Sequence, residues 1–274
     1  MTRSLVLTAD DAGTDPDADR EIAALLAGSP LTAVGVVTAD PEAGRASWPA
    51  NGWENPGAAR AVRLIAASAP AVAPGVHVVL PAPGPDGGLD DVVDRITAQL
   101  DALTRATTAA GAPAPDRLDS HQGTLYGLLG RSYLAEAIGL CAARGLAFRL
   151  PRSLDLYGDD DPVLALPDVR SRHASAVAAA DDAGVRMPQV IATHRGSDAE
   201  ALDYTTLRDH YLRLLERLPE GTSEIFLHPA PDTARLRELS SGWWRKRTWE
   251  LRLLGDPVFT REIERQGIDL VSRW

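Results

Sequence analysis

Short apolar runs alternate with helix-like stretches along the whole chain, and this alternation constrains the fold more than any other feature. Most of the runs are continuously apolar, which is typical of strands that are covered on both faces. Strands separated by helices pair in parallel within α/β folds. The eight candidate strands are Ser4–Thr8, Ala33–Thr38, Val76–Leu80, Asp116–Asp119, Ala147–Leu150, Gln189–Ala192, Glu224–Leu227 and Asp269–Val271.

Three of the intervening stretches show a clear helical period. One ends before Gly111, one ends at Gly145, and one ends before Pro219. Their apolar positions are Ile96, Leu100 and Leu103, then Leu134, Ile138 and Cys141, then Leu207, Tyr211, Leu214, Leu215 and Leu218. A single α/β barrel needs about 250 residues, and the chain has 274. We therefore predict one domain over residues 1–274. Its fold is expected to be α/β, a distorted (β/α) barrel of parallel strands that is either closed or left open on one side.

The charge balance limits the kinds of partner. Acidic residues number 38 against 28 lysines and arginines, a formal net charge of −10. This excess argues against nucleic acid and against an anionic membrane surface as partners. We found neither a signal-peptide pattern nor an apolar run near the ~18 residues of a membrane helix, so a cytoplasmic location is expected. The single cysteine, Cys141, excludes an internal disulfide and is expected to be buried and inert.

Polar residues that could act in catalysis or metal binding follow several candidate strands. Asp10 and Asp11 come after the first strand, His121 after the fourth, and His228 after the seventh. In α/β folds the C-terminal ends of parallel strands converge on one face, where active sites lie. Carboxylates and histidines at that face are typical of a metal-dependent hydrolase.

Alternative roles remain open for these residues. A sharp turn at Ala12-Gly13 would let one aspartate of the Asp10-Asp11 pair coordinate a cation while the other handles a proton. Alternatively, one of them caps the first helix, a role for which Asp15, Asp17 and Asp19 also compete. His77 lies inside a strand run, where it would be a core histidine bonded to a backbone carbonyl or a ligand. His194 also follows a candidate strand.

Four motifs in order along the chain resemble those of the YdjC-like carbohydrate deacetylase family, which includes the chitooligosaccharide deacetylases. Residues 8–13 (TADDAG) are similar to the family's N-A-D-D-F-G, and residues 75–80 (GVHVVL) to its G-L-H-L-x-L. Residues 118–123 (LDSHQG) are similar to L-D-S-H-Q-H, and His228-Pro229 to H-P-G. The end of the chain, from Arg235 to Trp274, follows the family pattern as well.

The resemblance implies a distorted α/β barrel that removes an N-acetyl group from an amino sugar or a short N-acetylated oligosaccharide. It implies one divalent metal ion, Zn or Mg, held by Asp11, His77 and His121. Asp10 would take the proton from water and His228 would protonate the leaving amine. The expected partner is a small N-acetylated carbohydrate, and a homodimer stays open.

Three positions depart from the family pattern. Gly123 replaces the second histidine of H-Q-H, which would weaken metal binding if that histidine were a ligand. Ala12 replaces an aromatic residue and Ala230 replaces a glycine, so each would reshape the pocket. These departures leave two other functions open: metal-assisted hydrolysis of another amide or ester, and carbohydrate binding without turnover.

Tryptophans are candidates for stacking on sugar faces, because the indole offers a flat apolar surface with one donor. Trp48 and Trp53 lie in the aperiodic stretch Thr38–Pro56, which is interpreted as a long loop, and they are the predicted substrate contacts. Core or oligomer packing is the alternative, and it is favoured for the later group Trp243, Trp244 and Trp249.

Overall fold

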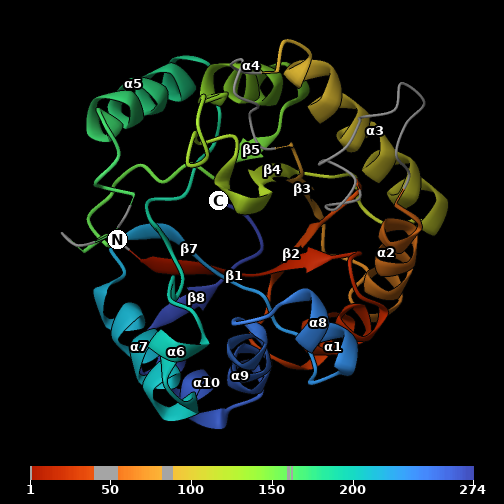
Figure 1. The fold of residues 1–274 in the computed structure, drawn as a ribbon, viewed down its shortest axis with the longest axis vertical. Helices are drawn as coiled ribbons and strands as arrows, with labels where there is room; N and C mark the ends of the chain where they lie inside the picture. The colour runs from red at the N-terminus through yellow and green to blue at the C-terminus, as the bar shows by residue number, and fades with distance from the viewer. Residues whose placement is uncertain (1, 40–54, 82–88, 159–160, 162) are drawn as a thin grey trace.

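Eight parallel strands form one strongly curved sheet, and helices surround it (Figure 1). The computed structural model describes residues 2–39, 55–81, 89–158, 161 and 163–274. The predicted α/β barrel with incomplete closure is confirmed, and each predicted strand has a counterpart. The strands are β1 (Arg3–Ala12), β2 (Ala33–Val36), β3 (Gly75–Val78), β4 (Arg117–Ser120), β5 (Ala147–Phe148), β6 (Ile191–Ala192), β7 (Gly221–Leu227) and β8 (Ile268–Leu270).

The strand order is β5-β4-β3-β2-β1-β7-β6, and β8 pairs with β1 outside this path. One edge of β1 pairs with β7 over residues 3–9. The other edge pairs with β8 over residues 3–5 and with β2 over residues 8–12. β1 is therefore the central strand, and β8 fills the edge that β2 leaves free instead of completing a ring.

Ten helices are described, and their ends carry the expected signals. Asp15 caps α1 and Asp203 caps α7 through side-chain hydrogen bonds. Gly111 and Gly145 end α3 and α4 in the left-handed conformation, which confirms the predicted ends of these helices. The helices are α1 (Pro16–Gly28), α2 (Pro56–Ser68), α3 (Val92–Ala110), α4 (Leu134–Arg144), α5 (Val169–Asp182), α6 (Asp198–Ala201), α7 (Tyr204–Arg217), α8 (Ala234–Leu239), α9 (Trp244–Leu254) and α10 (Pro257–Arg265).

The two ends of the sheet path approach each other without forming a ladder in the described residues. The backbone N–H of Phe148 donates to the carbonyl of Arg186 at 2.9 Å, and that of Arg152 donates to the carbonyl of Pro188 at 2.9 Å. These bonds join the end of β5 to the segment before β6. We call this irregular junction the seam. β5 and β6 each contain only two residues, so side chains of the following loops surround the interior there.

Two further expectations concern single features. Cys141 is fully buried, which confirms the predicted burial, and burial raises the pKa of its thiol to about 12 and disfavours the reactive thiolate. No described helix has the length and apolar character needed to cross a lipid bilayer. The cytoplasmic location and the homodimer stay predictions.

Candidate metal centre and active site

A bulge at the end of β1 brings both aspartates of the pair to one site. The register with β2 shifts between Ala9 and Ala12, and Asp11 has a φ of 66°. Aspartate tolerates this left-handed conformation better than most residues, and a bulge re-aims the side chains beside it. The predicted turn thus exists, but it begins at Asp11 instead of Ala12. Because Asp15 caps α1, neither Asp10 nor Asp11 serves as the cap.

Asp11, His77 and His121 meet at the C-terminal ends of β1, β3 and β4. Asp11 Oδ1 lies 3.1 Å from His121 Nδ1 and 3.4 Å from His77 Nε2. The two imidazole nitrogens are 3.2 Å apart, and the rings meet edge to face at 84°. The three side chains predicted as metal ligands therefore converge.

The spacing of these three atoms fits a small divalent ion. Ligands about 2.0–2.1 Å from a tetrahedral zinc ion are separated from each other by about 3.3 Å. The observed separations of 3.1, 3.2 and 3.4 Å lie close to this value. Two imidazoles and one carboxylate are also the donor set of catalytic zinc sites, which keep a position open for water or substrate.

Further side chains fix the orientation of the three donors. His77 Nδ1 contacts the carboxylate of Asp119, so His77 Nε2 faces the other donors. Arg247 binds Asp11 Oδ2 at 2.8 Å and leaves Oδ1 directed at the histidines. Carboxylate–histidine pairs of this kind hold metal-binding imidazoles in place.

The charges around Asp11 and His77 shift the pKa values of these two donors strongly. Burial opposes the charged form of Asp11, yet Arg247 and His121 outweigh it and hold the pKa of Asp11 well below its usual range. Burial would also lower the pKa of His77, but the carboxylates of Asp119 and Asp10 raise this pKa well above its ordinary value. Asp11 is thus ionised near pH 7, as a metal-binding carboxylate must be.

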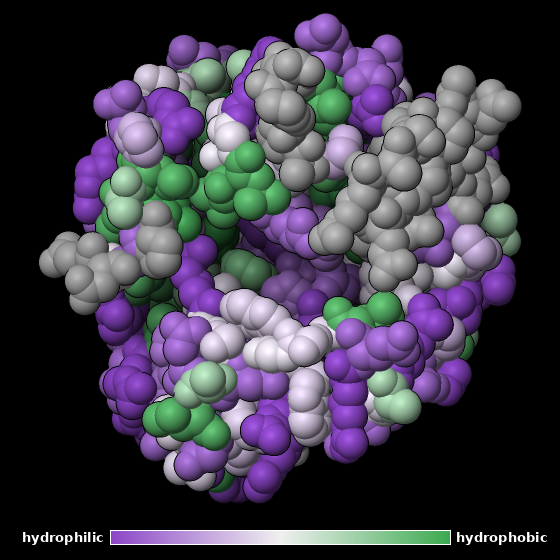
Figure 2. Space-filling view, viewed as in Figure 1, coloured by the Kyte–Doolittle hydropathy of each residue, from purple (hydrophilic) through white to green (hydrophobic). Residues whose placement is uncertain are grey.

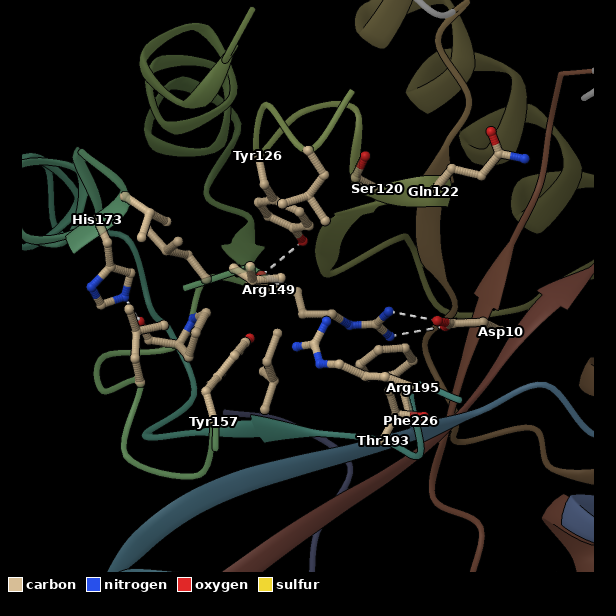
Figure 3. Close-up of a pocket in the computed structure, with 18 of the residues that line it drawn as sticks. Asp10, Ser120, Gln122, Tyr126, Arg149, Tyr157, His173, Thr193, Arg195 and Phe226 are labelled. Atoms are coloured by element: carbon tan, nitrogen blue, oxygen red, sulfur yellow. Dashed lines mark hydrogen bonds and ion pairs between the residues drawn. The ribbon is translucent and has the colours of Figure 1, made fainter. Parts of the chain in front are cut away.

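Asp10 is held by a buried arginine that sequence reasoning missed. Arg149 Nη1 and Nη2 bind the two oxygens of Asp10 at 2.7 and 2.9 Å (Figure 3). Nη2 also lies 2.9 Å from Asp119 and 2.8 Å from Glu224. Arg149 stands inside a candidate strand and just before Pro151, and a charged residue in an apolar run is a signal of a buried ion pair. That signal could have identified it.

His228 follows β7 and lines the same cavity as Asp10 and His77. Glu250 accepts a hydrogen bond from its backbone N–H at 2.8 Å, which fixes the chain at this position. Burial, with Arg247 and Lys246, outweighs the nearby Asp11 and Asp10 and lowers the pKa of His228 to about 3. The imidazole is therefore neutral near pH 7 in the absence of a ligand.

A cavity of 490 Å³ opens at these residues, a size common for small-molecule sites, which span about 300–1,000 Å³. Figure 2 shows the hollow near the centre of the face of the molecule that it displays. Trp243 lines it and is 43% exposed, whereas Trp249 packs against the core. Trp48 and Trp53 lie outside the described residues, so their predicted substrate contact stays a prediction.

His194 belongs to a different part of the cavity wall. Its backbone N–H donates to the hydroxyl of Tyr211 at 3.2 Å, and its ring meets that of His210 edge to face at 4.9 Å. It is absent from both groups of potential metal ligands found among the described residues. His194 is therefore a useful control position for substitutions of the metal centre.

The backbone at Gly123 bears on why a glycine stands where the family pattern has a second histidine. Gly123 does line the cavity, but its φ is 70°, and an added Cβ would lie 2.4 Å from Leu128 Cδ1. A histidine here would be strained and crowded. This backbone favours glycine, so the absence of the family's second histidine is consistent with the local path of the chain.

We expect Gly123→Ala to lower the free energy of unfolding by about 1–3 kcal/mol, because it combines a left-handed backbone with overpacking. Chemical denaturation measures the change. Gly139→Ala is the matched control: Gly139 is exposed in α4 with open space around it, and the substitution should raise stability by about 0.5–1 kcal/mol. Equal stability of Gly123→Ala and the unchanged protein would contradict the backbone argument.

Comparison with protein families gives one match. The family model described as YdjC-like protein matches residues 4–265. No curated protein matches the sequence.

Solved structures with the same fold are numerous but distant in sequence. A protein from Enterococcus faecalis V583, described as a candidate cellobiose-phosphate cleavage protein, has a TM-score of 0.70 and 21% identity, with 99% of this chain and 97% of that chain covered. The Bc1960 peptidoglycan N-acetylglucosamine deacetylase has a TM-score of 0.51 and 14% identity, over 98% of this chain and 86% of that one. At these identities the likeness concerns the fold.

Proposed function

Because the chain belongs to the YdjC-like family, we propose that it is a metal-dependent hydrolase that removes the N-acetyl group from an amino sugar or a short N-acetylated oligosaccharide. The observation that carries this proposal is the convergence of Asp11 Oδ1, His77 Nε2 and His121 Nδ1 beside Asp10. Asp11, His77 and His121 would hold the ion. When bound, a divalent ion polarises an acyl carbonyl and lowers the pKa of a coordinated water.

Asp10 is assigned the role of general base. Its carboxylate is buried and gripped through both oxygens by Arg149, so its orientation is fixed before substrate arrives. Preorganisation of this kind removes the cost of orienting the base during the reaction. Arg149 is a positioning residue, because it acts through Asp10.

His228 is assigned to proton delivery at the leaving amine. With a pKa of about 3, its imidazole is neutral near pH 7 and lacks the second ring proton that an acid would donate. It can protonate the amine only after taking up a proton, and the proton that Asp10 removes from water is the available one. The carboxylates of Asp10 and Asp11 raise the pKa of His228 and favour this uptake.

Acetate release from N-acetylated amino sugars and short oligosaccharides tests the proposal. We expect release by protein loaded with zinc or magnesium, loss of release after chelation, and recovery when the ion returns. Hydrolysis of simple amides or esters without acetate release from any sugar would favour another hydrolase. Metal and sugar binding without any turnover would leave a carbohydrate-binding protein.

A further inference from the structure

We propose that the substrate carries an apolar group next to its N-acetylated sugar, and that the cavity between the candidate catalytic residues and α5 binds this group. This inference rests on the proposed function and names the class of substrate, an N-acetylated glycoside with an alkyl-type aglycone. A site for an unsubstituted oligosaccharide would present mainly hydrogen-bonding groups, whereas this cavity is mainly apolar along one side.

The apolar side of the cavity is formed by the segments that follow β4 and β5, including the first residues of α4 and α5. Its lining residues share an aliphatic or aromatic side chain, and they come from two segments on either side of Arg149. They are Tyr126, Leu128, Leu134, Leu150, Leu154, Tyr157, Val163 and Val169. We call this surface the apolar wall. Figure 2 shows hydrophobic residues bordering the hollow on the side of α4 and α5.

Several residues of the apolar wall lie outside the hydrophobic core of the described residues. Leu128, Leu154, Val163 and Val169 are only partly buried and belong to no hydrophobic cluster of the described residues. Because these four aliphatic side chains line the cavity and are only partly buried, they keep apolar surface exposed to it. Such a surface favours an apolar ligand by about 25 cal/mol per Å² removed from water.

The apolar wall and the candidate catalytic residues share a single cavity. Asp10, His77 and His228 line one end of it, and Tyr157 and His173 line the other. In Figure 3, Arg149 lies between Asp10 and the end formed by Tyr126, Tyr157 and His173. An acetamido group held at Asp10 would therefore direct the adjoining part of the substrate along the wall.

The seam explains why the space exists. Leu150 and Leu154 follow the short strand β5, and Ile191 lies on the short strand β6. Further strand pairing between β5 and β6 would bring these side chains together and fill the interior. Because the described ladders end early, the side chains face the cavity instead.

The test compares the methyl and octyl β-glycosides of N-acetylglucosamine as substrates, below the micelle concentration of the octyl compound. Each methylene that leaves water favours binding about fourfold, so burial of three or more should raise kcat/KM by at least about 50-fold. The gain should appear mainly in KM. Equal kcat/KM values for the two glycosides would overturn the proposal.

Leu154→Asp should remove most of this preference, because it places a charged group on the apolar wall. Leu239→Asp is the matched control, because Leu239 is 51% exposed and does not line the cavity. It should keep the full preference. Loss of the preference in both variants, or in neither, would contradict a role for the wall.

Binding of octyl glucoside, which has no acetamido group, separates this inference from the proposed function. Calorimetry should detect binding to the unchanged protein and to Leu239→Asp, with at least about tenfold weaker binding to Leu154→Asp. Octyl glucoside binding without turnover of any glycoside would support the wall and contradict the deacetylase. Turnover of the methyl glycoside without octyl glucoside binding would support the deacetylase and contradict the wall.

Discussion

Replacing Asp11 by Asn should lower the affinity for zinc by at least about 100-fold, because it removes the only anionic donor of the Asp11–His77–His121 group. Even a substitution in the shell around metal ligands costs about 10–100-fold in affinity, so loss of a ligand should cost no less. Asn is similar in size to Asp and can still accept a hydrogen bond from Arg247 through its side-chain oxygen. Calorimetric titration of metal-free protein measures the affinity, and circular dichroism checks the fold.

Two histidine variants give this test its control. His77→Ala should also abolish zinc binding, whereas His194→Ala should retain it, since His194 lies on the cavity wall away from the three donors. If Asp11→Asn and His77→Ala both kept the full zinc affinity, the two residues would have a structural role and would not be metal ligands. Loss of affinity in all three variants, His194→Ala included, would indicate a general disturbance of the cavity.

The strands of the fold were predictable because their runs are apolar and end in recognisable turns. The helices α3 and α4 end at Gly111 and Gly145, as predicted, because glycine adopts the left-handed conformation at a helix end without steric cost. The strand order was not predictable. β8 pairs with the free edge of β1, although the two strands lie at opposite ends of the sequence. Such a pairing depends on tertiary packing, which a local sequence pattern does not indicate.

The length of β1 shows where the local pattern fails. The apolar run suggested an end at Thr8, but the strand continues to Ala12. Asp10 and Asp11 interrupt the hydrophobic pattern, yet both are buried because Arg149 and Arg247 lie opposite them. A buried charge needs such a partner, and the partners are more than a hundred residues away in the sequence.

The convergence of Asp11, His77 and His121 followed from general topology and from the family resemblance, since all three come at or near the C-terminal ends of parallel strands. The residues around them did not follow. Arg149 contacts Asp10, Asp119 and Glu224, which come from β1, β4 and β7, and only the curvature of the sheet brings the three carboxylates together. Sequence reasoning thus named three side chains that lie close together and missed the residues that orient them.

Asp10→Asn should bind zinc normally and lose about 10²–10⁴ in kcat, the usual cost of removing a general base. Asn has the shape of Asp, and its amide oxygen can still accept a hydrogen bond from Arg149. It cannot take a proton from water, so the metal centre should remain intact while the chemical step fails. Zinc affinity and the kcat for acetate release, measured on the same preparation, separate these two effects.

The contrast between the two adjacent aspartates makes the result decisive. The bulge directs Asp11 Oδ1 toward His77 and His121, whereas Arg149 holds both oxygens of Asp10. If Asp10→Asn lost zinc and Asp11→Asn kept it, the two roles would be reversed. If Asp10→Asn kept both zinc and near-normal kcat, its pair with Arg149 would be structural. Another group would then have to accept the proton from water. Among the described residues that line this end of the cavity, His228 is a neutral base that could do so.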